Sequence, residues 1–95
     1  MPVSLDTVVA QAERTAARVI DGKAVVIVID KQELHTLNPT GTFIWERAES
    51  ARSVSELVDQ VVREFEVDDE TARRDVVTFV ERLVGLGGLT VVEAK

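Results

Sequence analysis

The chain has 95 residues, of which 45% are hydrophobic and 29% are charged, and its formal net charge is −6. Both the length and the composition are those of a single globular domain, which we expect to span residues 1–95. The absence of cysteine excludes disulfides and thiolate metal sites, and the acidic balance argues against nucleic acid or an anionic membrane surface as a partner.

The N-terminal region, residues 1–14, gives no clear signal for secondary structure. Val3, Leu5, Val8 and Val9 are apolar, but their spacing fits neither a helix nor a strand. We therefore expect this region to form a partly ordered, partly flexible arm. The sequence contains no basic and apolar leader and no apolar run of membrane-spanning length, which favours a cytoplasmic location.

Three strands are predicted next, over residues 15–20, 23–29 and 32–37. Asp21 and Gly22 separate the first two, and this pair is typical of a type I′ hairpin turn. The second strand is apolar on both faces, so we expect it in the middle of a sheet with both faces covered. The third strand alternates polar with apolar residues, which is typical of an edge strand.

Three helices are predicted over residues 39–49, 53–65 and 69–86. Asn38 and Pro39 have the residue types preferred at the cap and at the first position of a helix. Gly41 is a poor helix former, and its place in the first turn indicates that another segment packs close to its backbone. Ser53 and Glu56 form a capping-box pattern at the start of the second helix.

The third helix is apolar over about half of its circumference, which is more than a surface helix of a small domain needs. One face is centred on Ala72, Val76, Phe79, Leu83 and Leu86, and the extra width comes from Val77, Val80 and Val84. The additional apolar surface could face the sheet, a partner subunit or a bound peptide, or it could belong wholly to the core. Gly87 and Gly88 end this helix, and residues 89–92 are expected to form a short extended tail.

A series of short motifs runs through most of the chain: Leu37-Asn38, Gly41, Ile44-Trp45, Arg52-Ser53-Val54, Glu56-Leu57-Val58, Phe65, Val67, Asp75-Val76, Phe79-Val80, Leu83 and Gly87-Gly88-Leu89. In this order and spacing they resemble the PqqD family, the small proteins of pyrroloquinoline quinone (PQQ) biosynthesis. Their relatives are recognition elements for ribosomally made, modified peptides. The resemblance implies an α+β, winged-helix-like fold, in which a three-stranded antiparallel β-meander precedes three α-helices.

The resemblance also implies a function. Members of the family are similar in having no catalytic residues, metal or cofactor; they act as chaperones for the leader segment of a precursor peptide and present it to a radical SAM or other modifying enzyme. The leader adds as a further strand to the edge of the third strand and lies against the third helix, a mode called β-augmentation.

The residues themselves supply both walls of such a groove, namely the polar edge strand and the wide apolar arc. The candidate hydrogen-bonding ladder is Glu33, Leu34, His35, Thr36 and Leu37. The candidate helix wall is Arg73, Val76, Val77, Val80 and Val84. Helical phase alone leaves open which of the wall residues face the groove and which face the core.

Other functions fit parts of the pattern less well. The second and third helices resemble the helix-turn-helix of a winged-helix DNA-binding regulator, but Asp68, Asp69 and Glu70 would stand at the front of its recognition helix. His35 is the only histidine, and we interpret it as a polar edge residue rather than a catalytic or metal-binding one. An adaptor role in a non-peptide pathway stays open, as does a homodimer formed through the free edge strand.

Overall fold

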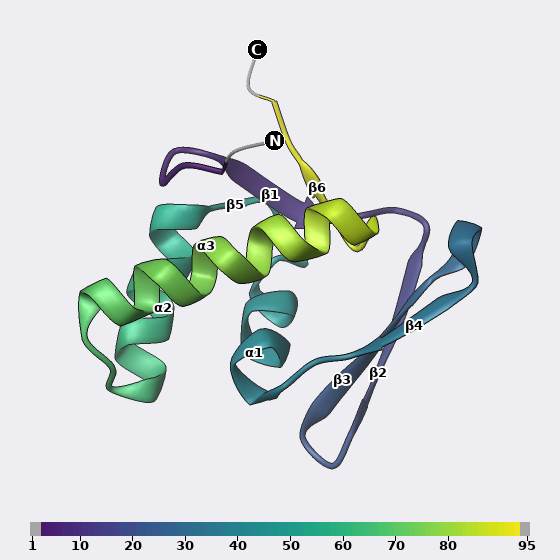
Figure 1. The fold of residues 1–95 in the computed structure, drawn as a ribbon, viewed down its shortest axis with the longest axis horizontal. Coiled ribbons are helices and arrows are strands. Elements are labelled where there is room, and N and C mark those ends of the chain that lie inside the picture. The colour runs from purple at the N-terminus through teal and green to yellow at the C-terminus, as the bar shows by residue number, and fades with distance from the viewer. Residues whose placement is uncertain (1–2, 94–95) are drawn as a thin grey trace.

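The computed structural model describes residues 3–93, in which two small antiparallel sheets pack with three helices (Figure 1). In chain order the elements are β1 (Val8–Gln11), β2 (Thr15–Ile20), β3 (Lys23–Val28), the short 3-10 helix η1 (Ile29–Lys31), β4 (Glu33–Thr36), α1 (Pro39–Arg47), β5 (Arg52–Ser53), α2 (Val54–Phe65), α3 (Asp69–Leu86) and β6 (Leu89–Val91). The antiparallel meander β2–β3–β4 followed by α1, α2 and α3 confirms the predicted α+β, winged-helix-like fold.

The larger sheet has the strand order β2–β3–β4, so β4 is an edge strand as predicted. The turn between β2 and β3 has positive φ angles at both central residues, 53° at Asp21 and 78° at Gly22, as a type I′ turn requires. The last strand is shorter than predicted. It begins at Glu33 because η1 and a left-handed Gln32 (φ 55°) occupy the turn before it.

The helices cover this sheet on one face only. Ala24, Val26 and Val28 point to the covered face and are buried, whereas Ile27 points away and is 37% exposed. The prediction that both faces of the middle strand are covered is therefore wrong. A run of β-branched residues is typical of a fully buried strand, but here half of them lie on an open face.

The smaller sheet is formed by segments that lie far apart in the sequence, in the order β5–β1–β6. The arm expected from the sequence is ordered at Val8–Gln11, where it forms the central strand of this sheet; Met1 and Pro2 lie outside the described residues. Val9 is fully buried, and the side chain of Gln11 donates a 2.8 Å hydrogen bond to the carbonyl of Trp45. The extended tail predicted after the last helix is present as β6.

Each of the three α-helices begins at a side-chain cap that the sequence contains. The Oδ1 atom of Asn38 accepts the N–H of Gly41 at 2.7 Å, and Ser53 and Glu56 form the predicted capping box at the start of α2. Asp68 caps α3, and its hydrogen bonds from the hydroxyl and N–H of Thr71 lower the pKa of the Asp68 carboxyl. At their other ends, α1 stops at Arg47, two residues before the predicted end, and α3 stops at Leu86 as predicted.

The hydroxyl of Thr42 joins α1 to the sheet. Its Oγ1 atom accepts the N–H of Ala24 at 2.8 Å and donates to the carbonyl of Leu37 at 3.5 Å. The N–H of Leu37 in turn bonds directly to the carbonyl of Ala24 at 2.8 Å. Thr42 is 6% exposed and therefore bridges the strand pair inside the core, where an unpaired backbone group is costly.

We predict that Thr42→Val lowers the free energy of unfolding by about 1–3 kcal/mol, because the N–H of Ala24 loses its acceptor in the core while the volume of the side chain barely changes. Urea unfolding followed by circular dichroism measures the effect. The matched control is Thr78→Val on the exposed surface of α3, which should change stability by less than about 0.5 kcal/mol. Equal effects of the two substitutions would contradict the bridging role.

The central face of α3 belongs to the core. Val76 and Val80 are fully buried, together with Ala72 and Leu83. A charge at position 80 would stand among apolar side chains without a partner. Its desolvation penalty is comparable to the whole stability of a small domain.

We therefore predict that Val80→Asp does not fold, whereas Val92→Asp does, because Val92 is 38% exposed. Far-ultraviolet circular dichroism and the amide dispersion in an NMR spectrum distinguish the two outcomes. A folded Val80→Asp variant would mean that this side chain can turn outward.

Candidate functional site

The outer edge of β4 offers free backbone hydrogen-bonding groups. The N–H of Leu37 bonds to the carbonyl of Ala24, and His35 is paired with Val26. Because hydrogen-bonded positions alternate along an antiparallel strand, the N–H and C=O groups of Glu33 and His35 point toward β3. By the same alternation the N–H and C=O groups of Leu34 and Thr36 point away from the sheet. Among residues 3–93, β4 pairs only with β3, and β1 is engaged in the other sheet. The edge is thus open to a further strand.

The side chains of β4 divide between the two faces of the sheet. Leu34 and Thr36 lie on the uncovered face, where Leu34 is 66% exposed. His35 lies on the covered face, with its Nε2 atom 3.3 Å from Oε1 of Glu33. Leu37, the last residue of the predicted ladder, is 2% exposed and belongs to the core.

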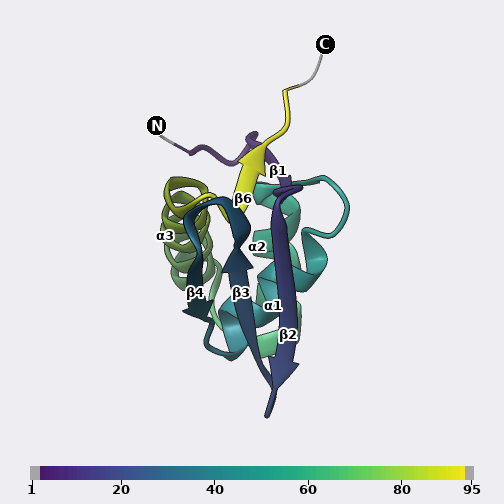
Figure 2. The ribbon, with the colours of Figure 1, turned by 90° about the vertical axis from the view of Figure 1, so that its right-hand side faces the viewer.

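Figure 2 shows β4 as the edge of the larger sheet nearest to α3 and β2 as the far edge. Close to the end of β4, a cavity of about 500 Å³ lies between α1 and α3. Its residues from the start of α1 are Asn38, Thr40, Gly41 and Ile44. Its residues from α3 are Arg74, Asp75, Thr78, Phe79 and Arg82.

Gly41 sets how closely α1 and α3 approach at this cavity. A Cβ atom added at Gly41 would lie 2.7 Å from Cε1 of Phe79, closer than such atoms approach in proteins. The close packing that the sequence predicts at Gly41 is therefore confirmed, and the packed segment is the ring of Phe79. This ring forms the apolar side of the cavity together with Ile44.

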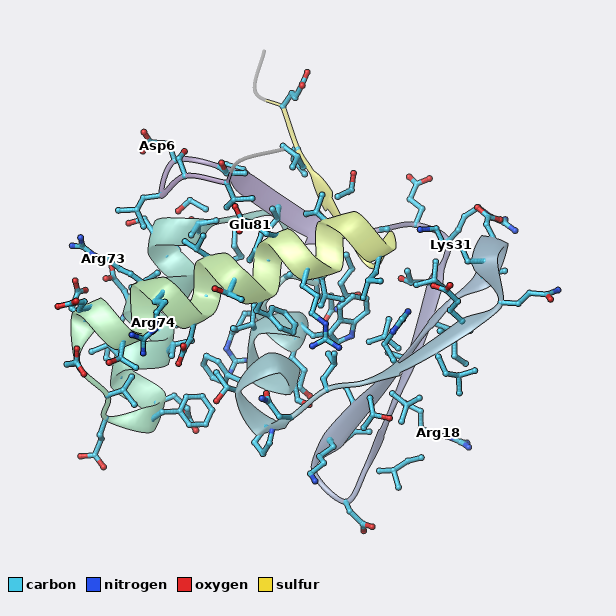
Figure 3. All side chains as sticks on the ribbon, in the orientation of Figure 1. Asp6, Arg18, Lys31, Arg73, Arg74 and Glu81 are labelled. Atoms are coloured by element: carbon cyan, nitrogen blue, oxygen red, sulfur yellow. The ribbon has the colours of Figure 1, made fainter. Side chains whose placement is uncertain are left out.

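The helix wall predicted from the sequence divides into two groups, neither of which lines this cavity. Val76 and Val80 are fully buried in the core. Arg73, Val77 and Val84 lie on the flank of α3 that carries Glu81, whose carboxylate accepts the N–H of Val3 at 3.4 Å. Arg73 is itself paired with Asp69 at 2.7 Å. Figure 3 shows Glu81 on the side of α3 that faces β1.

The residues of α3 that line the cavity lie on the opposite flank and are not among those predicted from the sequence. Thr78 and Arg82 are exposed, and Phe79 is half-buried between α3 and α1. Each of these residue types is common on the surface or in the core of an ordinary helix, so none of them indicates a site by itself. The signal that could have identified this flank is Gly41, because the side chain that packs on it marks the side of α3 facing the cavity.

The far edge of the sheet, β2, is also unpaired within the described part of the chain. The cavity beside it is lined by side chains of mainly polar character, among them Gln11, Glu46, Arg47 and Glu49. Strand addition there would supply backbone hydrogen bonds but little apolar contact. The β4 edge, with the half-buried ring of Phe79 close to its end, offers both.

Within residues 3–93, no three side chains of the His, Cys, Asp and Glu types gather closely enough to hold a metal ion. Over the same residues, no helix combines the length and the apolar character that a membrane span requires.

Comparison with known proteins supports the architecture. In fold the chain is similar to TbiB1 in complex with the TbiA(beta) leader peptide, with a TM-score of 0.80, 24% sequence identity, and coverage of 90% of this chain and 99% of that chain. It is also similar to lasso peptide synthetase B1 complexed with the leader peptide, with a TM-score of 0.76, 22% identity, and coverage of 86% and 96%. No curated protein matches the sequence.

The family model for Coenzyme PQQ synthesis protein D (PqqD) matches residues 23–88. This range includes β3, β4, α1, α2 and α3, and it covers more than half of the chain. The resemblance found in the sequence is thereby confirmed, and the chain belongs to the PqqD family.

Proposed function

We propose that this protein is a non-catalytic adaptor that binds the leader segment of a ribosomally made precursor peptide and presents it to a separate modifying enzyme, such as a radical SAM enzyme. The observation that carries the proposal is the unpaired edge of β4, which ends at the cavity between α1 and α3. The fold adds support, because the two similar structures named above are complexes with leader peptides.

The leader binds by β-augmentation along Glu33, Leu34, His35 and Thr36. The outward N–H and C=O groups of Leu34 and Thr36 form the new hydrogen bonds. We expect the added strand to run antiparallel to β4, because antiparallel pairing is slightly more stable and every strand pair in the described residues is antiparallel.

On the helix side, we assign the contacts to Thr78, Phe79 and Arg82. This assignment replaces the wall expected from the sequence, since Val76 and Val80 have no exposed surface to offer. Leu37 likewise acts from the core, where it fixes the end of β4. Side chains of the leader that point to the covered face of the sheet would meet the half-buried ring of Phe79.

The proposal predicts that Thr36→Pro weakens peptide binding roughly threefold to tenfold without unfolding the domain. Proline removes the outward N–H of Thr36 and is tolerated on an edge strand where that N–H faces solvent. The probe is a peptide selected by the wild-type protein from a displayed library of randomised peptides of about 12 residues, long enough for one strand and its flanks. Calorimetric titration measures the affinity.

The matched control is Thr36→Val, which keeps the N–H and suits a strand, so it should bind as the wild type does. Equal affinities of the proline and valine variants would contradict strand addition at this edge. A library from which the wild-type protein enriches no peptide would contradict peptide recognition itself.

A further inference from the structure

The cavity between α1 and α3 combines an apolar side with a basic wall. Phe79 and Ile44 form the apolar side. Arg74 and Arg82 form the basic wall, and because they lie four residues before and four residues after Thr78, all three share one face of α3.

These two guanidinium groups are only weakly engaged by carboxylates of the protein. The nearest partner of Arg74 is Asp75, at 3.8 Å, and the side chain of Arg74 is 70% exposed. Arg82 forms no ion pair with any of residues 3–93. By contrast, Arg14 and Arg73 are each 2.7 Å from an aspartate oxygen.

The overall charge makes this arrangement distinctive. The chain has 17 acidic and 11 basic side chains, so its surface repels an acidic peptide at most places. At the cavity the balance of charge is reversed, because its lining contains two arginines and one aspartate, Asp75. A guanidinium group matches a carboxylate in shape and donates two parallel hydrogen bonds to it.

We infer that this cavity selects a peptide with an acidic side chain next to an apolar one, the acid binding Arg74 and Arg82 and the apolar side chain packing on Phe79. The inference rests on the proposed function and names the class of peptide that the site takes. Since β4 runs toward the cavity and the added strand is antiparallel, the acid precedes the strand-forming stretch of the peptide.

The test uses the displayed library of randomised peptides, selected in parallel on three proteins. The wild-type protein should enrich Asp or Glu at one position, just before an apolar, β-prone stretch. The double variant Arg74→Glu with Arg82→Glu should instead enrich Lys or Arg at that position. The control Arg63→Glu, on α2 and outside the cavity, should keep the preference for an acid.

Affinities of one synthesised peptide give a second readout. Replacing its acidic residue by the corresponding amide should weaken binding to the wild type roughly threefold to tenfold. The same replacement should change nothing for Arg74→Gln with Arg82→Gln, a variant that keeps the fold because both side chains are exposed.

A wild-type selection without a preferred acid, or an acid preference that survives the charge reversal, would overturn the inference. If the selected peptides still depend on the N–H of Thr36, the proposed function stands and only the acid preference fails. If no peptide is enriched at all, both fail.

Discussion

The hydroxyl of Thr42 fixes where the larger sheet ends and the helical layer begins. It bridges the N–H of Ala24 and the carbonyl of Leu37, so the first turn of α1 is held against the end of β4. This places Gly41 under the ring of Phe79 and opens the cavity directly beyond the edge strand. The geometry of the candidate site therefore depends on one buried hydrogen-bonded bridge between a strand pair and a helix.

An unpaired edge is a liability that proteins normally protect, and this one carries an exposed leucine, Leu34. The segment Val8–Gln11 does not cover it, because as β1 this segment is the central strand of the smaller sheet. That arrangement leaves β4 free while the domain keeps a closed core. In the proposed function, backbone pairing at this edge needs no catalytic group, and selectivity would come from the side chains at the cavity.

The sequence correctly predicted the helix caps and the hairpin turn, because neighbouring residues determine these features. Asn38, Ser53 and the Asp21-Gly22 pair specify their caps and turn by themselves, and each is found as expected. The strand β1 was missed because its partners, β5 and β6, lie far along the chain. The spacing of apolar residues predicted the width of the apolar arc on α3, but not which segments pack against it. Val3 packs on the core beside the flank of α3 that was expected to bind peptide. On the opposite flank, Phe79 packs on Gly41.

Hydrogen exchange at single amides of the larger sheet, measured by NMR with and without a selected peptide, tests strand addition most directly. In the free protein the amides of Leu34 and Thr36 should exchange fast, whereas those of His35 and Leu37 should already be slow. Saturating peptide should slow Leu34 and Thr36 and leave Ala17 and Val19 on β2 unchanged. Protection at the β2 edge, or none at Leu34 and Thr36, would contradict recognition at β4.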